Sequence, residues 1–74
     1  MENLDAVKAL ITVMQSTSYP LDVRASAAEG LGYTGFTTAI DALDTVMKST
    51  SYPLDVRVAA AKALGRAVGV ATRK

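Results

Sequence analysis

The stretch STSYPLDVR at residues 16–24 decides the fold, because it returns letter for letter at residues 49–57. Setting each residue against the one 33 positions later gives 19 identities in 41 pairs. Self-similarity at a period of this length is typical of stacked supersecondary units that share one continuous core. We therefore expect a single domain over residues 1–74, with one repeat at about 3–35 and a second at about 36–74.

The composition limits what this chain can do and what can stabilise it. A chain of 74 residues buries only about 60% of the surface that its unfolded form exposes, so its core supplies only a few kcal/mol. The sequence has no cysteine and no histidine, which excludes disulfides, imidazole catalysis and the commonest zinc ligands. We expect a non-enzymatic protein without metal or cofactor, stabilised by close helix packing or by self-association.

Charge and hydropathy are unevenly placed along the chain. Eight Lys and Arg nearly balance seven Asp and Glu, yet residues 1–55 carry a net charge of −4 and residues 56–74 a net charge of +5. Lys62 and Arg66 interrupt the longest apolar segment, so no run long enough to span a membrane remains. Glu2, close to the start, does not fit a signal peptide. We expect a cytoplasmic protein that does not enter membranes.

The first repeat predicts two helices. Asn3 is placed to cap the first helix, and Pro20 fits the first position of the second, where its missing N–H costs nothing. Asp22 follows in the first turn, beside the positive end of the helix dipole. Gly32 is expected to end the second helix in the left-handed conformation. Helical spacing predicts inward side chains at Leu4, Val7, Leu10, Ile11 and Met14 in the first helix and at Val23, Ala27, Ala28 and Leu31 in the second.

The second repeat predicts two further helices. Thr38, with Asp41 three positions later, resembles a capping box at the start of the third helix. The apolar stripe of that helix is Ile40, Leu43 and Met47. Residue 53 is again a proline that opens the fourth helix, and we expect this helix to continue past Gly65 because a helical pattern resumes there. The predicted fold class is all-α, with four helices in two antiparallel pairs.

The residues after the repeated turn resemble a known family. PLDVR is followed by ASAAEGLG in the first repeat and by VAAAKALG in the second, a pattern similar to the HEAT-like repeats of phycobilisome-lyase-type proteins. The resemblance covers nearly the whole chain and implies a short α-solenoid of two helix-hairpin repeats. The family often has an acidic residue where this sequence has Ser18 and Ser51. The pattern recurs in scaffold proteins, bilin lyase subunits and nucleic-acid-binding relatives, so it indicates a fold more than a function.

Arg24 and Arg57 occupy equivalent positions in the two repeats. Arg57 falls among apolar residues on a helical wheel, which predicts a partly buried guanidinium bonded to turn carbonyls or to Asp22 or Asp55. We expect both arginines, with the prolines that precede them, Pro20 and Pro53, to be structural. The alternative is that each arginine binds an anion.

Several other residues allow both a functional and a structural interpretation. Asp41 and Asp44 could pair their carboxylates for acid–base chemistry, but no opposed group accompanies them, so we expect a solvated face. Tyr19 and Tyr52 could be recognition aromatics, although packing over the turn is the expected role.

The second helix of each repeat offers a candidate partner-binding row. Helical wheels place six residues on one side, opposite the predicted core, and the resemblance implies that this side is the concave surface of the solenoid. Glu29 of the first repeat is replaced by Lys62 in the second, and Tyr33 is replaced by Arg66. The alternative is an ordinary solvated face. The six residues are Asp22, Glu29 and Tyr33 in the first repeat and Asp55, Lys62 and Arg66 in the second.

The function that these features favour is a protein–protein interaction or scaffold module. We also expect a homodimer, most simply a twofold one, because solenoids usually need three repeats and the last helix carries Val58, Val68 and Val70 outside the predicted core. One alternative is nucleic-acid binding by the basic last helix, which five cations without interleaved aromatics support poorly. Another is an accessory subunit related to bilin lyases or phycobilisome proteins, which rests on the resemblance alone.

Overall fold

The computed structural model describes residues 3–73, and this part of the chain is helical without strands. It contains α1 (Asn3–Gln15), α2 (Leu21–Leu31), α3 (Thr37–Lys48) and α4 (Leu54–Thr72). The structure therefore confirms an all-α fold. Three short connections join helices that pack against one another, as in a hairpin solenoid.

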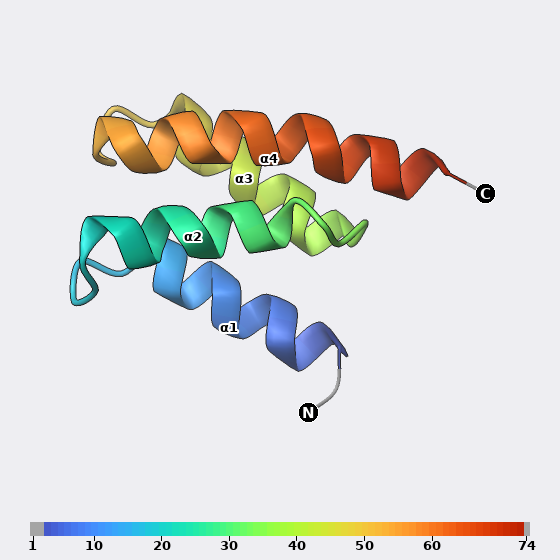
Figure 1. Ribbon diagram of the computed structural model, residues 1–74, viewed down its shortest axis with the longest axis horizontal. Helices are drawn as coiled ribbons and strands as arrows, with labels where there is room; N and C mark the ends of the chain where they lie inside the picture. Colours follow the sequence, from blue (N-terminus) through green and yellow to red (C-terminus); the bar gives the residue numbers. More distant parts are fainter. Residues whose placement is uncertain (1–2, 74) are drawn as a thin grey trace.

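The four helices form two stacked hairpins. Figure 1 shows α2 between α1 and α4, with α3 behind α2 and α4. The helix that closes the first repeat, α2, thus packs directly on the helix that closes the second, α4. The assembly measures 34 × 26 × 16 Å along its principal axes, a flat shape that leaves the outer side of both α2 and α4 open.

Small side chains fill much of the core, which lets the helices approach closely. Two expectations about the core are wrong: Val23 is 42% exposed and Leu4 is 43% exposed. Val23 lies at the end of the stack, since its equivalent in the second repeat, Val56, is fully buried. The fully or nearly fully buried apolar residues are Val7, Met14, Ala27, Ala28, Leu31, Ala39, Leu43, Val46, Val56, Ala59, Ala60, Ala63 and Ala67.

The repeated turn folds the same way in both repeats. The Ser18 N–H donates a 3.1 Å hydrogen bond to Ser16 Oγ, and the Ser51 N–H donates one of 3.2 Å to Ser49 Oγ. Pro20 caps α2 with φ −61° and ψ 156° instead of occupying its first helical position. The identical sequence therefore forms the same serine contact and the same proline N-cap in both repeats, which sets the entry of both second helices.

The start of α3 differs from the sequence-based expectation. Phe36 is the N-cap residue, and among the described residues no side chain bonds to the free N–H groups at this end. The capping box predicted from Thr38 and Asp41 is therefore wrong. The backbone carbonyl of Asp41 instead accepts a 3.0 Å hydrogen bond from Thr45 Oγ1.

Gly32 ends α2, but in the right-handed region, with φ −65° and ψ −17°. The prediction of a left-handed residue is wrong, because the chain leaves the helix through a tightened turn in which the Gly32, Tyr33 and Thr34 N–H groups each bond three residues back. Glycine is required here by space: a Cβ on Gly32 would lie 2.9 Å from the Cα of Ala63 in α4.

The fourth helix continues past Gly65 to Thr72, as the sequence predicted. This extension packs on the connector between the repeats, because a Cβ at Gly35 would lie 3.2 Å from the Cα of Ala71 and 3.2 Å from a Val70 methyl group. The added turns of α4 thus hold the link between the two hairpins in place.

Candidate functional site

The two repeated arginines bind the ends of the preceding helices. Arg24 Nε donates a 3.1 Å hydrogen bond to the Met14 carbonyl, and Arg57 Nε donates one of 3.1 Å to the Met47 carbonyl. These carbonyls belong to the last turns of α1 and α3, where no intrahelical partner is available. Each guanidinium thus caps the end of the preceding helix, and of the predicted partners it is a backbone carbonyl that accepts the hydrogen bond.

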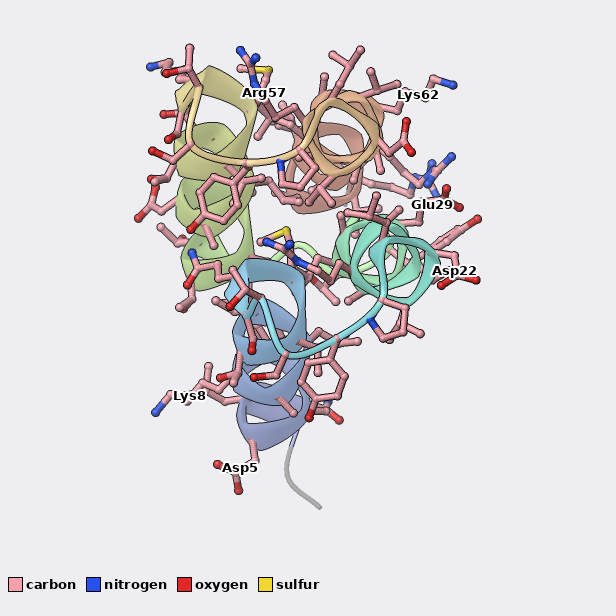
Figure 2. The ribbon with its side chains drawn as sticks, turned by 90° about the vertical axis from the view of Figure 1, so that its left-hand side faces the viewer. Asp5, Lys8, Asp22, Glu29, Arg57 and Lys62 are labelled. Atoms are coloured by element: carbon pink, nitrogen blue, oxygen red, sulfur yellow. The ribbon has the colours of Figure 1, made fainter. Side chains whose placement is uncertain are left out.

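The environments of the two arginines differ. Arg24 is only 4% exposed, and its guanidinium carbon lies 5.9 Å from the centre of the Tyr52 ring in the second repeat. Arg57 is half-buried and lies between α3 and α4 at the end of the stack (Figure 2). Tyr19, the equivalent of Tyr52, is 44% exposed. The arginine–tyrosine contact between adjacent repeats is thus made once within the chain.

The six residues of the predicted partner-binding row lie on the exposed side of α2 and α4 and the chain just after α2. Figure 2 shows Asp22, Glu29 and Lys62 projecting on the same side, away from Asp5 and Lys8 on α1. We call this set the charged row. It is acidic on α2 and mainly basic on α4, and all six residues are exposed: Asp22, Glu29, Tyr33, Asp55, Lys62 and Arg66.

One contact inside the charged row joins the two repeats. The guanidinium carbon of Arg66 lies 4.6 Å from the centre of the Tyr33 ring, close enough for a cation–π interaction. Tyr33 nevertheless remains 69% exposed. The arrangement presents an aromatic ring and a planar cation side by side at the surface, a pair of residue types that is enriched at protein interfaces.

The opposite side of the molecule is less distinctive. Asp44 forms an ion pair with Lys48 one turn later at 3.1 Å, in which the Lys48 side chain is 70% exposed and the Asp44 side chain 41% exposed. This is the single ion pair within 4 Å among the described residues. Asp41 and Asp44 therefore lie on a solvated face of α3, where such a pair contributes little to stability.

The outward side of α4 carries an apolar stripe that sequence reasoning found only in part. Val58 and Val68 are each 45% exposed, whereas Val70 is half-buried against Gly35 and lies on another side of the helix. The missed members could have been found from their spacing, which alternates between four and three residues, as in a helix-packing seam. We call the exposed set the outer stripe; it comprises Leu54, Val58, Ala61, Gly65 and Val68.

The described residues offer an open surface without an enclosed site. Residues 3–73 form no pocket, and they contain no cluster of three or more Asp or Glu side chains placed to hold a metal ion. None of the four helices is long and apolar enough to cross a membrane. The distinctive surfaces of α2 and α4 are the charged row and the outer stripe.

Comparison with known proteins agrees with this architecture. A family model described as HEAT repeats matches residues 7–72, which include most of α1 and all of the other helices. No curated protein and no solved structure matches the chain significantly. With two stacked helix hairpins and a family match over nearly its full length, the chain belongs to the HEAT-repeat family.

Proposed function

We propose that this chain is a non-enzymatic protein-interaction module that docks a partner protein on the charged row and self-associates through the outer stripe. HEAT repeats commonly mediate protein–protein interaction. The observation that supports the docking site is the charged row itself, an exposed set of equivalent positions in which Glu29 on α2 becomes Lys62 on α4 and Tyr33 becomes Arg66.

The charges of the row suit a protein partner with complementary charges of both signs. Lys62 and Arg66 would meet acidic groups, while Asp22 and Glu29 would meet basic ones. Such complementarity acts mainly on the rate of association and on partner choice. A polyanion such as nucleic acid would instead be repelled by the acidic part of the row.

The experiment is affinity capture from the source cell with the wild-type chain and with the Lys62→Glu, Arg66→Glu double variant. We expect a partner that the wild type retains and the double variant loses, with association that weakens as salt rises. The matched control is Lys8→Glu with Arg73→Glu, which makes the same charge change at exposed sites outside the row. Equal capture by both double variants would contradict docking on the row.

A single further variant separates a protein partner from nucleic acid. Glu29→Lys replaces an acid of the row by a cation. It should therefore weaken the binding of a protein that contacts this acid, and it should strengthen the binding of a phosphate backbone. Nucleic acid should also give a steep, log-linear dependence of affinity on salt.

Capture of a pigment-protein would favour an accessory role in phycobilisomes, for which the sequence resemblance is the present support. We place the module in the cytoplasm on the same sequence expectations.

A further inference from the structure

The outer stripe of α4 corresponds to the side of α2 that is covered within the chain. Ala28 is fully buried, but its equivalent Ala61 is exposed. Gly32 lies against Ala63, whereas among the described residues nothing comes within 4 Å of a Cβ placed at Gly65. The two repeats keep the same residue at both pairs of positions. At Ala61 and Gly65 the outer stripe thus keeps the residues that α2 uses to pack on α4, without a third repeat packed on it.

The opposite end of the stack shows the reverse relationship. Val23 is 42% exposed while its equivalent Val56 is fully buried. Ser26 is likewise exposed, although its equivalent Ala59 is only 6% exposed. We call Val23 and Ser26 the lower side of α2. The internal contact between α2 and α4 uses surfaces equivalent to these two. In it, α2 contributes the side that corresponds to the outer stripe, and α4 contributes the side that corresponds to the lower side of α2.

The contact between an arginine and a tyrosine of adjacent repeats also has an equivalent that the chain cannot make within itself. Within the chain, Arg24 lies over the ring of Tyr52, which belongs to the next repeat. The equivalent of this pair across a further junction is Arg57 with Tyr19. Arg57 is half-buried at one end of the stack, and Tyr19 is 44% exposed at the other.

Charge decides between the two ways in which copies could pair. In an antiparallel twofold pair of α4 helices, the same flank meets itself, so Lys62 and Arg66 would face the same cations of the second copy. Head-to-tail stacking instead brings α2 of the second copy beside α4, so Lys62 approaches its Glu29. The internal α2–α4 junction also sets the acidic α2 beside the basic α4 (Figure 2), with the two helices stacked in the reverse order.

We propose that a second copy of the chain stacks head-to-tail on the first, with the lower side of its α2 on the outer stripe of α4. This rests on the self-association in the proposed function and replaces the twofold pairing with a directional one. Each added copy leaves a new outer stripe open, so the assembly grows without closing. The charged rows of successive copies then join into one longer row.

The test uses one variant at each end of the stack. Gly65→Glu places a carboxylate on the outer stripe, where the structure has open space, and Ser26→Arg places a cation on the exposed lower side of α2. The matched controls, Thr50→Glu and Thr17→Arg, make the same changes in exposed turns. Circular dichroism confirms that each variant keeps its helices, and light scattering or analytical ultracentrifugation gives the mass.

The wild type and both controls should exceed twice the chain mass of 7.7 kDa as concentration rises. Gly65→Glu and Ser26→Arg should each stay monomeric alone, with association weakened roughly tenfold or more. Mixed in equal amounts, they should form a one-to-one dimer, because each keeps the half that the other lacks.

Two results would overturn the proposal in distinguishable ways. A twofold dimer predicts that Ser26→Arg still dimerises alone and that mixing adds no new species. That result would refute head-to-tail stacking while leaving self-association intact. A wild-type mass of 7.7 kDa at all concentrations would refute self-association itself. Neither result bears on docking at the charged row, which the capture experiment tests separately.

Discussion

Gly32 in α2 lies so close to Ala63 in α4 that a Cβ on the glycine would stand 2.9 Å from the alanine Cα and 3.0 Å from its carbonyl oxygen. Two of these neighbouring atoms belong to the backbone of α4, which cannot move without shifting the helix. This contact fixes the distance between the two repeats. Its equivalent in the second repeat, Gly65, has open space on the same side.

The first prediction compares alanine at these two glycines. Gly32→Ala should lower the free energy of unfolding by about 1–3 kcal/mol, because the added methyl group forces α2 and α4 apart. Gly65→Ala should raise it by about 0.4–1 kcal/mol, because alanine restricts the unfolded chain and favours the helix. Urea unfolding of both variants at low protein concentration measures the difference. A stabilising Gly32→Ala would mean that the repeats are not held this closely.

This pair also shows what sequence can and cannot predict. The 33-residue period predicted four helices in two hairpins, and the helical pattern after Gly65 predicted the extension of α4, because each depends on local pattern and spacing. The role of Gly32 could not be read the same way. A glycine at a helix end suits a left-handed cap and a close helix crossing equally well, and only the position of Ala63 separates the two.

The second prediction concerns the two arginine caps. Arg24→Met should lower the free energy of unfolding by about 1–3 kcal/mol, because it leaves the Met14 carbonyl without its donor inside a buried contact. Arg57→Met should cost less, about 0.5–1.5 kcal/mol, since Arg57 is half-buried and water can reach the Met47 carbonyl. Thermal or urea unfolding measures both. Equal losses would mean that burial of the arginine does not determine its contribution.

The third prediction tests the small-residue seam of α4. Ala60 is fully buried and its neighbour Ala61 is exposed. Ala60→Leu should therefore lower the free energy of unfolding by about 1–3 kcal/mol through overpacking, while Ala61→Leu should change it by no more than about 0.5 kcal/mol. Unfolding is measured at a concentration where the wild type is monomeric. A neutral Ala60→Leu would contradict its place in the core.

The surfaces were harder to predict than the core. Helical wheels placed the charged row correctly on the exposed side, because the row is opposite the apolar residues of each helix. They placed Val23 inward, since a wheel of one repeat cannot show that Val23 lies at the end of the stack while its equivalent Val56 lies inside it. Burial in a repeat protein depends on the neighbouring repeat as much as on the residue itself.

The last prediction compares Tyr19→Ala with Tyr52→Ala. Tyr52 is half-buried, packs against the core and lies beneath the Arg24 guanidinium. Removing its ring should lower the free energy of unfolding by about 1–3 kcal/mol, through lost burial and a lost cation–π contact. Tyr19 is 44% exposed, so its removal should change the stability of the monomer by no more than about 0.5 kcal/mol.

Self-association should show the contribution of Tyr19. In the head-to-tail stack, Tyr19 of one copy packs over Arg57 of the copy before it, as Tyr52 packs over Arg24 within the chain. Tyr19→Ala should therefore weaken association, measured by sedimentation, while its unfolding curve at low concentration matches the wild type. Arg57→Met should weaken association to a similar degree, and the double variant should lose little more, because the two residues belong to one contact. Fully additive losses would place Tyr19 and Arg57 in separate contacts and remove this pair from the junction.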